Sequence, residues 1–185
     1  MSLTARAAAA AALLIVPVSA ELVWPAAFDQ PAGHVLFAAS QLAGWLLLAG
    51  IVRGAPEPAG RAARGGRRAV LAGCLFQVLF ALVYGVTALD GSPWELSFVL
   101  FLLGFVAQFV GGMVWGTALL RTGVAATAGA GVLAVAALGA LAVLVGADPF
   151  HDVFLLSSYA GWVVVGWGLS GPGGGRPSLN RPIRG

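Results

Sequence analysis

The residues best suited to chemistry in this chain are its two histidines and a few acids. His34 and His151 each follow an aspartate and a proline and precede an apolar run. Imidazole and carboxylate bind divalent cations together, so His34, His151 and Asp152 are candidate metal ligands. With Asp29 and Glu95, the two histidines are expected to face one cavity that opens outward. Such a cluster would also suit a polar lipid headgroup, or haem if the two rings face each other.

Glu95 and Asp152 are also candidate catalytic residues. A carboxyl group can act as general acid or base, and aromatic side chains stabilise cationic intermediates. The alternative is structural, because residues 92–95 read Ser-Pro-Trp-Glu, a capping box with Glu95 at the third helical position. The histidines are likewise explained as wetted interfacial residues at helix starts.

Further polar side chains recur on single faces of the apolar segments. Residues seven or eleven apart return to nearly the same helix face, and polar stripes in a membrane bundle point inward. The candidate ligand-binding residues on these stripes are His34, Gln41, Gln77, Gln108, Trp115, Ser158, Tyr159 and Trp162. The alternative role for such groups is interhelical hydrogen bonding, worth about 0.6 kcal/mol per bond on average.

No recognised catalytic or cofactor motif accompanies these residues. The sequence contains no P-loop, dinucleotide-binding glycine fingerprint, nucleophile elbow, His-Glu-x-x-His motif or paired CxxC. It has no lysine, which excludes a retinal Schiff base. Its single cysteine, Cys74, excludes an internal disulfide and a thiolate metal cluster. The sequence therefore identifies no cofactor.

Membrane-spanning helices must position all of these side chains. The chain is 59% hydrophobic and 9% charged, with a mean hydropathy of +0.93, whereas soluble domains are about 25% charged. A transmembrane helix needs about 20 mostly apolar residues. Segments that approach or meet this length are residues 7–28, 34–52, 69–89, 94–120, 124–147 and 150–169. The predicted fold is an all-α bundle of six transmembrane helices in one membrane domain, residues 1–170, with a flexible tail over residues 171–185.

The first segment has a second interpretation. Arg6, a short apolar run, Pro17 and small residues at 18–20 are typical of a signal peptide. Cleavage before Glu21 would leave five helices. Apolar character resumes at residues 22–24, however, and ends in a tryptophan suited to the membrane interface. Retention of this helix is the favoured interpretation.

The charges predict an orientation. All ten basic residues are arginines, and they lie in or beside the two termini and every second loop. Six of the seven acids lie in or beside the remaining loops. By the positive-inside rule both termini are cytoplasmic. The composition, rich in alanine, glycine and arginine, indicates a GC-rich bacterial genome, so the expected location is the bacterial plasma membrane. Nucleic acid is not an expected partner, because the arginines are dispersed.

Two segments share a register that indicates an internal repeat. His34, Phe37, Ser40, Gly44 and Trp45 match, at the same offsets, His151, Phe154, Ser157, Gly161 and Trp162. We interpret the chain as three helical hairpins inserted in parallel, with a looser match in the middle one. In transporters with internal repeats the site lies at the repeat interface. Chance matching within a small apolar alphabet is the alternative.

Glycines in the fourth segment predict close helix packing. Gly112 and Gly116 form a small-xxx-small pair, which lets two backbones approach. The fifth segment, residues 124–147, is nearly all alanine, glycine, valine and leucine. We expect it to be a packing element without chemistry.

Two functions of different classes remain. The favoured one is a non-enzymatic membrane protein that binds a lipid or apolar small molecule, or that serves as an accessory subunit. Its expected partners are membrane lipids, an apolar ligand, and further subunits of a homo- or hetero-oligomer. The alternative is a membrane-embedded enzyme acting on a lipid or isoprenoid, by analogy with terpene cyclases. Outward-facing acids count against the alternative, because isoprenoid substrates are usually made in the cytoplasm.

Overall fold

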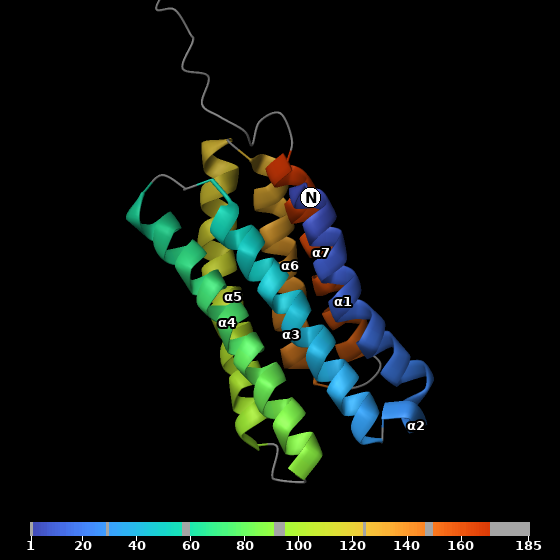
Figure 1. The fold of residues 1–185 in the computed structure, drawn as a ribbon. Coiled ribbons are helices and arrows are strands. Elements are labelled where there is room, and N and C mark those ends of the chain that lie inside the picture. The colour runs from blue at the N-terminus through green and yellow to red at the C-terminus, as the bar shows by residue number, and fades with distance from the viewer. Residues whose placement is uncertain are drawn as a thin grey trace, which may run out of the picture.

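The computed structural model describes residues 2–28, 30–56, 60–90, 95–123, 125–146 and 150–170. Its helices in chain order are α1 (Leu3–Val23), α2 (Pro25–Phe28), α3 (Pro31–Gly54), α4 (Arg61–Asp90), α5 (Glu95–Thr122), α6 (Ala126–Val145) and α7 (Phe150–Ser170). Six of them are long and apolar enough to cross a membrane; α2 is a single short turn. The predicted six-helix bundle is confirmed (Figure 1), and the chain is a polytopic membrane protein.

The first helix differs from its predicted bounds at both ends. Ser2 caps α1, because its hydroxyl accepts a 3.2 Å hydrogen bond from a backbone N–H of the first turn. The helix therefore starts earlier than residue 7. It ends at Val23, because proline lacks an N–H and restricts the residue before it, and Pro25 begins a separate turn. The predicted continuous helix over residues 7–28 is therefore wrong.

The third membrane helix is longer than its apolar segment. Hydropathy predicts a start at residue 69, but α4 begins at Arg61, so the arginine-rich stretch is helical. Arg67 anchors this extension to the end of α3: its guanidinium donates to the Val52 carbonyl (2.9 Å) and the Arg53 carbonyl (2.6 Å). Carbonyls at a helix end have no partner within their own helix. These two bonds therefore satisfy α3 and fix the first turns of α4 against it.

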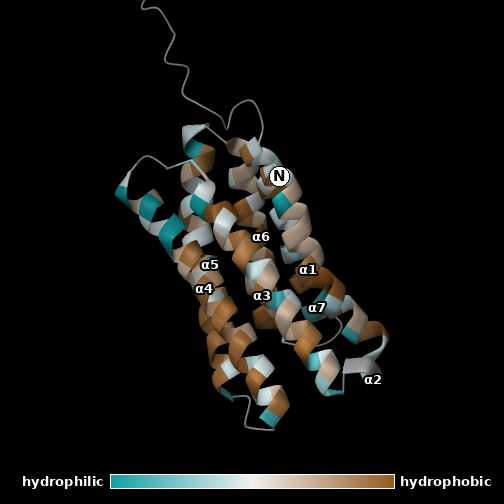
Figure 2. Ribbon diagram, in the orientation of Figure 1, coloured by the Kyte–Doolittle hydropathy of each residue, from teal (hydrophilic) through white to brown (hydrophobic). Residues whose placement is uncertain are grey.

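The six long helices form a closed ring. Each packs against the helices before and after it in the chain, and α7 returns to pack against α1. Figure 1 shows α1 and α7 side by side near the N-terminus. Figure 2 shows hydrophobic residues along the middle of the helices and hydrophilic residues near their ends, most clearly at the start of α4. Loss of α1 would leave a gap between α3 and α7.

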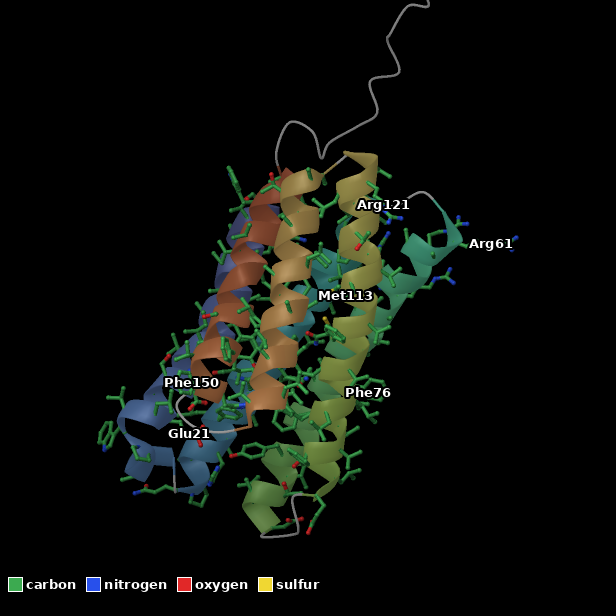
Figure 3. All side chains as sticks on the ribbon, turned by 180° about the vertical axis from the view of Figure 1, so that it is seen from behind. Glu21, Arg61, Phe76, Met113, Arg121 and Phe150 are labelled. Atoms are coloured by element: carbon green, nitrogen blue, oxygen red, sulfur yellow. The ribbon has the colours of Figure 1, made fainter. Side chains whose placement is uncertain are left out.

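The two ends of the bundle carry opposite charges. The described arginines lie at one end, here called the arginine end: Arg6, Arg53, Arg61, Arg64, Arg67, Arg68 and Arg121. The described acids lie at the other, the acidic end: Glu21, Asp90, Glu95 and Asp152. Figure 3 shows Arg61 and Arg121 toward one end and Glu21 and Phe150 toward the other. Asp29, Glu57 and Asp148 lie outside the described residues.

Glycine sets the spacing between α5 and α6. A Cβ at Gly112 would lie 2.9 Å from the Ala136 Cβ, and one at Gly116 would lie 2.9 Å from the Gly129 carbonyl oxygen. Real side chains do not approach so closely, so these helices depend on glycine for their separation. The predicted role of this small-xxx-small pair is confirmed. As expected, α6 packs against its neighbours α5 and α7; that it takes part in no chemistry stays a prediction.

Equivalent positions of two hairpins make equivalent contacts. Gly44 of α3 packs against Leu14 of α1, and Gly161 of α7 packs against Val135 of α6. In both hairpins the second helix meets the first at the matched glycine, and the tryptophan that follows it is buried. These contacts agree with the predicted relation between the first and third hairpins.

Candidate functional site

Polar side chains on the inward helix faces make hydrogen bonds inside the ring. Gln41, which is 1% exposed, donates from Nε2 to the Leu14 carbonyl on α1 (3.3 Å). Its Oε1 accepts from Trp45 Nε1 (3.1 Å). One buried amide therefore ties α3 to α1 and also satisfies a buried indole.

Two further bonds tie neighbouring helices in the same way. Gln77 donates from Nε2 to the Phe101 carbonyl (3.1 Å), which links α4 to α5. Ser158 donates to the Val135 carbonyl (3.2 Å), which links α7 to α6. This is the structural role that the sequence allowed for these polar residues. Ligand binding by Gln41, Gln77 and Ser158 stays a prediction.

Three buried donors lack a partner among the described residues. They are Gln108 Nε2, Trp115 Nε1 and Trp162 Nε1. A buried N–H without an acceptor costs about 1–3 kcal/mol. Tyr159 is also buried, and its ring packs edge-on against Trp45 with centroids 5.7 Å apart. The inward faces are therefore aromatic and carry more donors than the described acceptors satisfy.

The first histidine contacts a neighbouring helix. His34 Nδ1 lies 2.7 Å from the Tyr84 hydroxyl on α4, and the two rings pack edge-on with centroids 5.7 Å apart. The Tyr84 ring also packs against Phe37 and Phe80. His34 is therefore part of an aromatic cluster between α3 and α4.

The second histidine contacts its own hairpin. His151 Nδ1 lies 2.7 Å from the Ala142 carbonyl oxygen on α6. A carbonyl oxygen only accepts, so Nδ1 carries a proton and donates. In the neutral ring Nε2 is then an acceptor, and in the charged ring Nε2 is a second donor. His151 is partly exposed and lines a pocket, so Nε2 is the ring nitrogen that a ligand can use.

That pocket opens at the acidic end and continues into a groove. It has a volume of about 280 Å³ and is lined by Phe98, Phe101, Leu102, Val143, Gly146 and His151. An apolar groove of about 190 Å³ follows the seam between α5 and α6, lined by Phe105, Val106, Phe109, Ala140, Val143 and Leu144. Val143 lines both, so the two adjoin. We call them together the α5–α6 groove.

The candidate acids and metal ligands are not gathered at this groove. Glu95 is exposed and Asp152 is partly exposed, at the starts of α5 and α7, and neither is among the described lining residues. The described lining includes His151 but not His34, so the described residues do not form the expected common cavity. Among them, no group of three or more His, Cys, Asp or Glu side chains could hold a metal. Asp29 lies outside the described residues.

Sequence reasoning missed the apolar wall of the α5–α6 groove. Phe98, Phe101, Phe105 and Phe109 are separated by three, four and four positions, a spacing that places them on one helix face. Phe98 and Phe109 are 43% and 39% exposed, so this aromatic row reaches the membrane-facing surface. The signal was present in the sequence, but an apolar face of a membrane helix is ordinarily a packing or lipid-contact face.

Comparison with known proteins adds no relative. No protein-family model, curated protein or solved structure matches this chain. The α5–α6 groove is therefore the feature that bears on function. Its described lining has one titratable side chain, His151, whose imidazole can bind a ligand or act as a general acid or base.

Proposed function

We propose that the protein binds a membrane lipid in the α5–α6 groove. The polar part of the lipid lies at His151, and one acyl or isoprenoid chain follows the four phenylalanines. The observation that carries the proposal is the junction, at Val143, of an apolar groove with a pocket containing one imidazole. Ligand sites typically combine a mostly apolar wall with a few placed polar groups.

The length of the groove supports a single lipid chain. From Phe98 to Phe109 the helix advances by about 16 Å at roughly 1.5 Å per residue. The hydrocarbon core of a bilayer is about 30 Å thick. The aromatic row therefore spans about half the bilayer, the depth of one leaflet.

In this proposal the selectivity for one lipid over another comes from His151 and from the shape of the groove. A lipid chain that enters the groove leaves hydrocarbon rather than water, so its burial gains no hydrophobic free energy. A preference for one lipid must come from the fit against the phenylalanines and from the bond to Nε2. The neutral ring accepts from a lipid hydroxyl, and the charged ring donates to a phosphate oxygen.

The proposal includes a location and an orientation. The arginine end faces the cytoplasm of a bacterial cell, as the positive-inside rule requires, and the groove then opens into the outer leaflet of the plasma membrane. Binding is favoured over the enzymatic alternative, because the described lining of the groove offers His151 but no second titratable group to complete an acid–base or nucleophile–base pair.

Photo-crosslinking tests the proposal. A phosphatidylglycerol with a diazirine in one acyl chain, reconstituted with the full chain, should crosslink to the α5 and α6 residues that line the groove. Val143→Trp fills the groove where its two parts meet and should reduce this crosslinking. Leu141→Trp is the matched control, because Leu141 is 40% exposed on the same helix and is not a described lining residue.

Equal crosslinking in the wild type and Val143→Trp would contradict the groove as the site, as would equal loss in both tryptophan variants. His151→Ala should leave the contacts of the acyl chain with the groove unchanged. It should weaken the preference for one lipid headgroup over another by about 2- to 10-fold, the value of one hydrogen bond. Mass analysis of the recovered lipid distinguishes the alternative, because a converted lipid would indicate catalysis.

A further inference from the structure

Three arginines lie on one face of α4 at the arginine end. Arg64, Arg67 and Arg68 are followed by Leu71, so the spacing is i, i+3, i+4 and i+7, which puts all four side chains on one side of the helix. Together they line a pocket of about 270 Å³. Figure 3 shows Arg61, at the start of the same helix, toward this end of the bundle.

One of the three arginines is fixed by the fold. Arg67 is partly buried and donates from Nε to the Val52 carbonyl and from Nη2 to the Arg53 carbonyl. A guanidinium has five N–H donors, so these two bonds leave three. Because α3 holds the side chain in place, little conformational entropy is lost when the remaining donors bind an anion.

The other two arginines add charge that the described residues do not neutralise. Arg64 and Arg68 are exposed, and every described acid lies at the opposite end of the bundle. Like charges one helical turn apart repel, and the N-terminus of α4 adds a partial positive charge. A bound anion would relieve this repulsion.

We propose that this arginine pocket binds a phosphate group, first of all that of an anionic phospholipid in the adjoining leaflet. Guanidinium forks match phosphate oxygens in pairs, which is why arginine is favoured at phosphate sites. Leu71 lies about one turn nearer the membrane interior than Arg67 and gives the pocket an apolar wall on the side of the lipid chains. The pocket lies at the other end of the bundle from His151, so this proposal does not rest on the lipid site in the α5–α6 groove.

The test compares two probes on three forms of the full chain. The probes are dioleoyl-phosphatidylglycerol and, as its competitor, inorganic phosphate. Native mass spectrometry counts the bound phosphatidylglycerol molecules, with dioleoyl-phosphatidylcholine as the reference lipid. The forms are the wild type, Arg64→Gln with Arg68→Gln, and Arg61→Gln. The last is the control, because it removes one positive charge from the same helix end, and Arg61 is not among the described lining residues. Its effect is compared with the effect per arginine of the double variant.

The wild type should prefer phosphatidylglycerol, and the double variant should bind it about 25-fold more weakly, at roughly fivefold per arginine. Arg61→Gln should have a much smaller effect. Arg67 is left intact in this test, because its loss would also free the end of α3. Circular dichroism of the double variant should be unchanged, because both substituted side chains are exposed.

The competitor identifies the source of the phosphate. Phosphatidylglycerol binding that resists inorganic phosphate assigns the pocket to a lipid, whereas displacement by inorganic phosphate, absent in the double variant, assigns it to a soluble phosphate compound. Binding of both probes that is unchanged in the double variant would overturn the proposal. A loss in Arg61→Gln equal to the loss per arginine in the double variant would also overturn it, because diffuse charge rather than a pocket would then explain binding.

Discussion

Three buried tryptophans differ in one hydrogen bond. Trp45, Trp115 and Trp162 are each at most 1% exposed, and they lie on α3, α5 and α7. The Trp45 indole donates to Gln41, whereas the indoles of the other two have no partner among the described residues. The same substitution at the three positions therefore separates the value of this bond from that of the ring.

Phenylalanine at each tryptophan position tests this difference. Trp45→Phe should lower the free energy of unfolding by about 0.5–1.5 kcal/mol more than Trp115→Phe or Trp162→Phe, because it alone breaks a buried hydrogen bond. Equilibrium unfolding in mixed detergent and dodecyl sulfate micelles measures the three losses. Equal losses would indicate that the other two indoles have acceptors as good as Gln41.

Gln41 itself offers a second measurement at the residue scale. Gln41→Leu leaves the buried Trp45 N–H without its acceptor and removes the bond from α3 to the Leu14 carbonyl. It should therefore cost about 1–3 kcal/mol, more than the roughly 0.6 kcal/mol average for a membrane hydrogen bond. Ser40→Ala on the preceding position is the control. A loss no greater than that of the control would show that the amide does not tie α3 to α1.

At the scale of elements, the close contact between α5 and α6 depends on glycine, which has no side chain. Gly112 is buried, and an added Cβ would come within 2.9 Å of the Ala136 Cβ. By contrast, a Cβ at Gly50 of α3 would meet nothing within 4 Å. The two glycines therefore form a matched pair for the same substitution.

Gly112→Leu should destabilise the bundle by at least about 1–3 kcal/mol, the usual cost of overpacking, and Gly50→Leu should be tolerated. Thermal unfolding in detergent and the monodisperse fraction on size exclusion measure both effects. If Gly112→Leu is as stable as Gly50→Leu, the α5–α6 contact is not a tight interface.

At the scale of the whole molecule, the ring separates charge along its axis. Each long helix runs between the arginine end and the acidic end, and α1, α4 and α5 carry described charges of opposite sign at their two ends. Reversing any of these three helices would put charges of the wrong sign at both ends. The bundle as a whole can then lie in the membrane in one of two orientations, and the positive-inside rule predicts the one with the arginine end in the cytoplasm.

Cysteine labelling in intact cells checks that choice. Cys74 is fully buried, so it gives little background. Glu95→Cys should react with a membrane-impermeant maleimide from outside, and Arg61→Cys should react only after the cells are opened. A reporter that needs the periplasm, such as alkaline phosphatase fused after Gly185, should likewise be inactive. The reverse labelling pattern would contradict a cytoplasmic arginine end.

The sequence by itself determined the fold class and the six apolar segments, with retention of the first as the favoured interpretation. A run of about 20 apolar residues must satisfy its backbone as a helix in a bilayer, so composition and spacing were sufficient. Helix ends were less predictable. Hydropathy placed the start of α4 at residue 69, because it counts arginines as loop residues. The helix instead begins at Arg61, and Arg67 bonds its first turns to the end of α3.

Only the tertiary structure decided which side chains meet. The matched registers of His34 and His151 predicted equivalent places, and both do begin inward stripes of matched helices. The ring gives them different neighbours, Tyr84 on α4 for one and the Ala142 carbonyl on α6 for the other. Sequence periodicity fixes the face of a helix on which a residue lies, but which helix packs against that face depends on the order of helices around the ring. For that reason the polar stripes were predictable and the α5–α6 groove was not. The arginine pocket, whose described lining residues all lie on α4, was missed because hydropathy treated residues 61–68 as a loop.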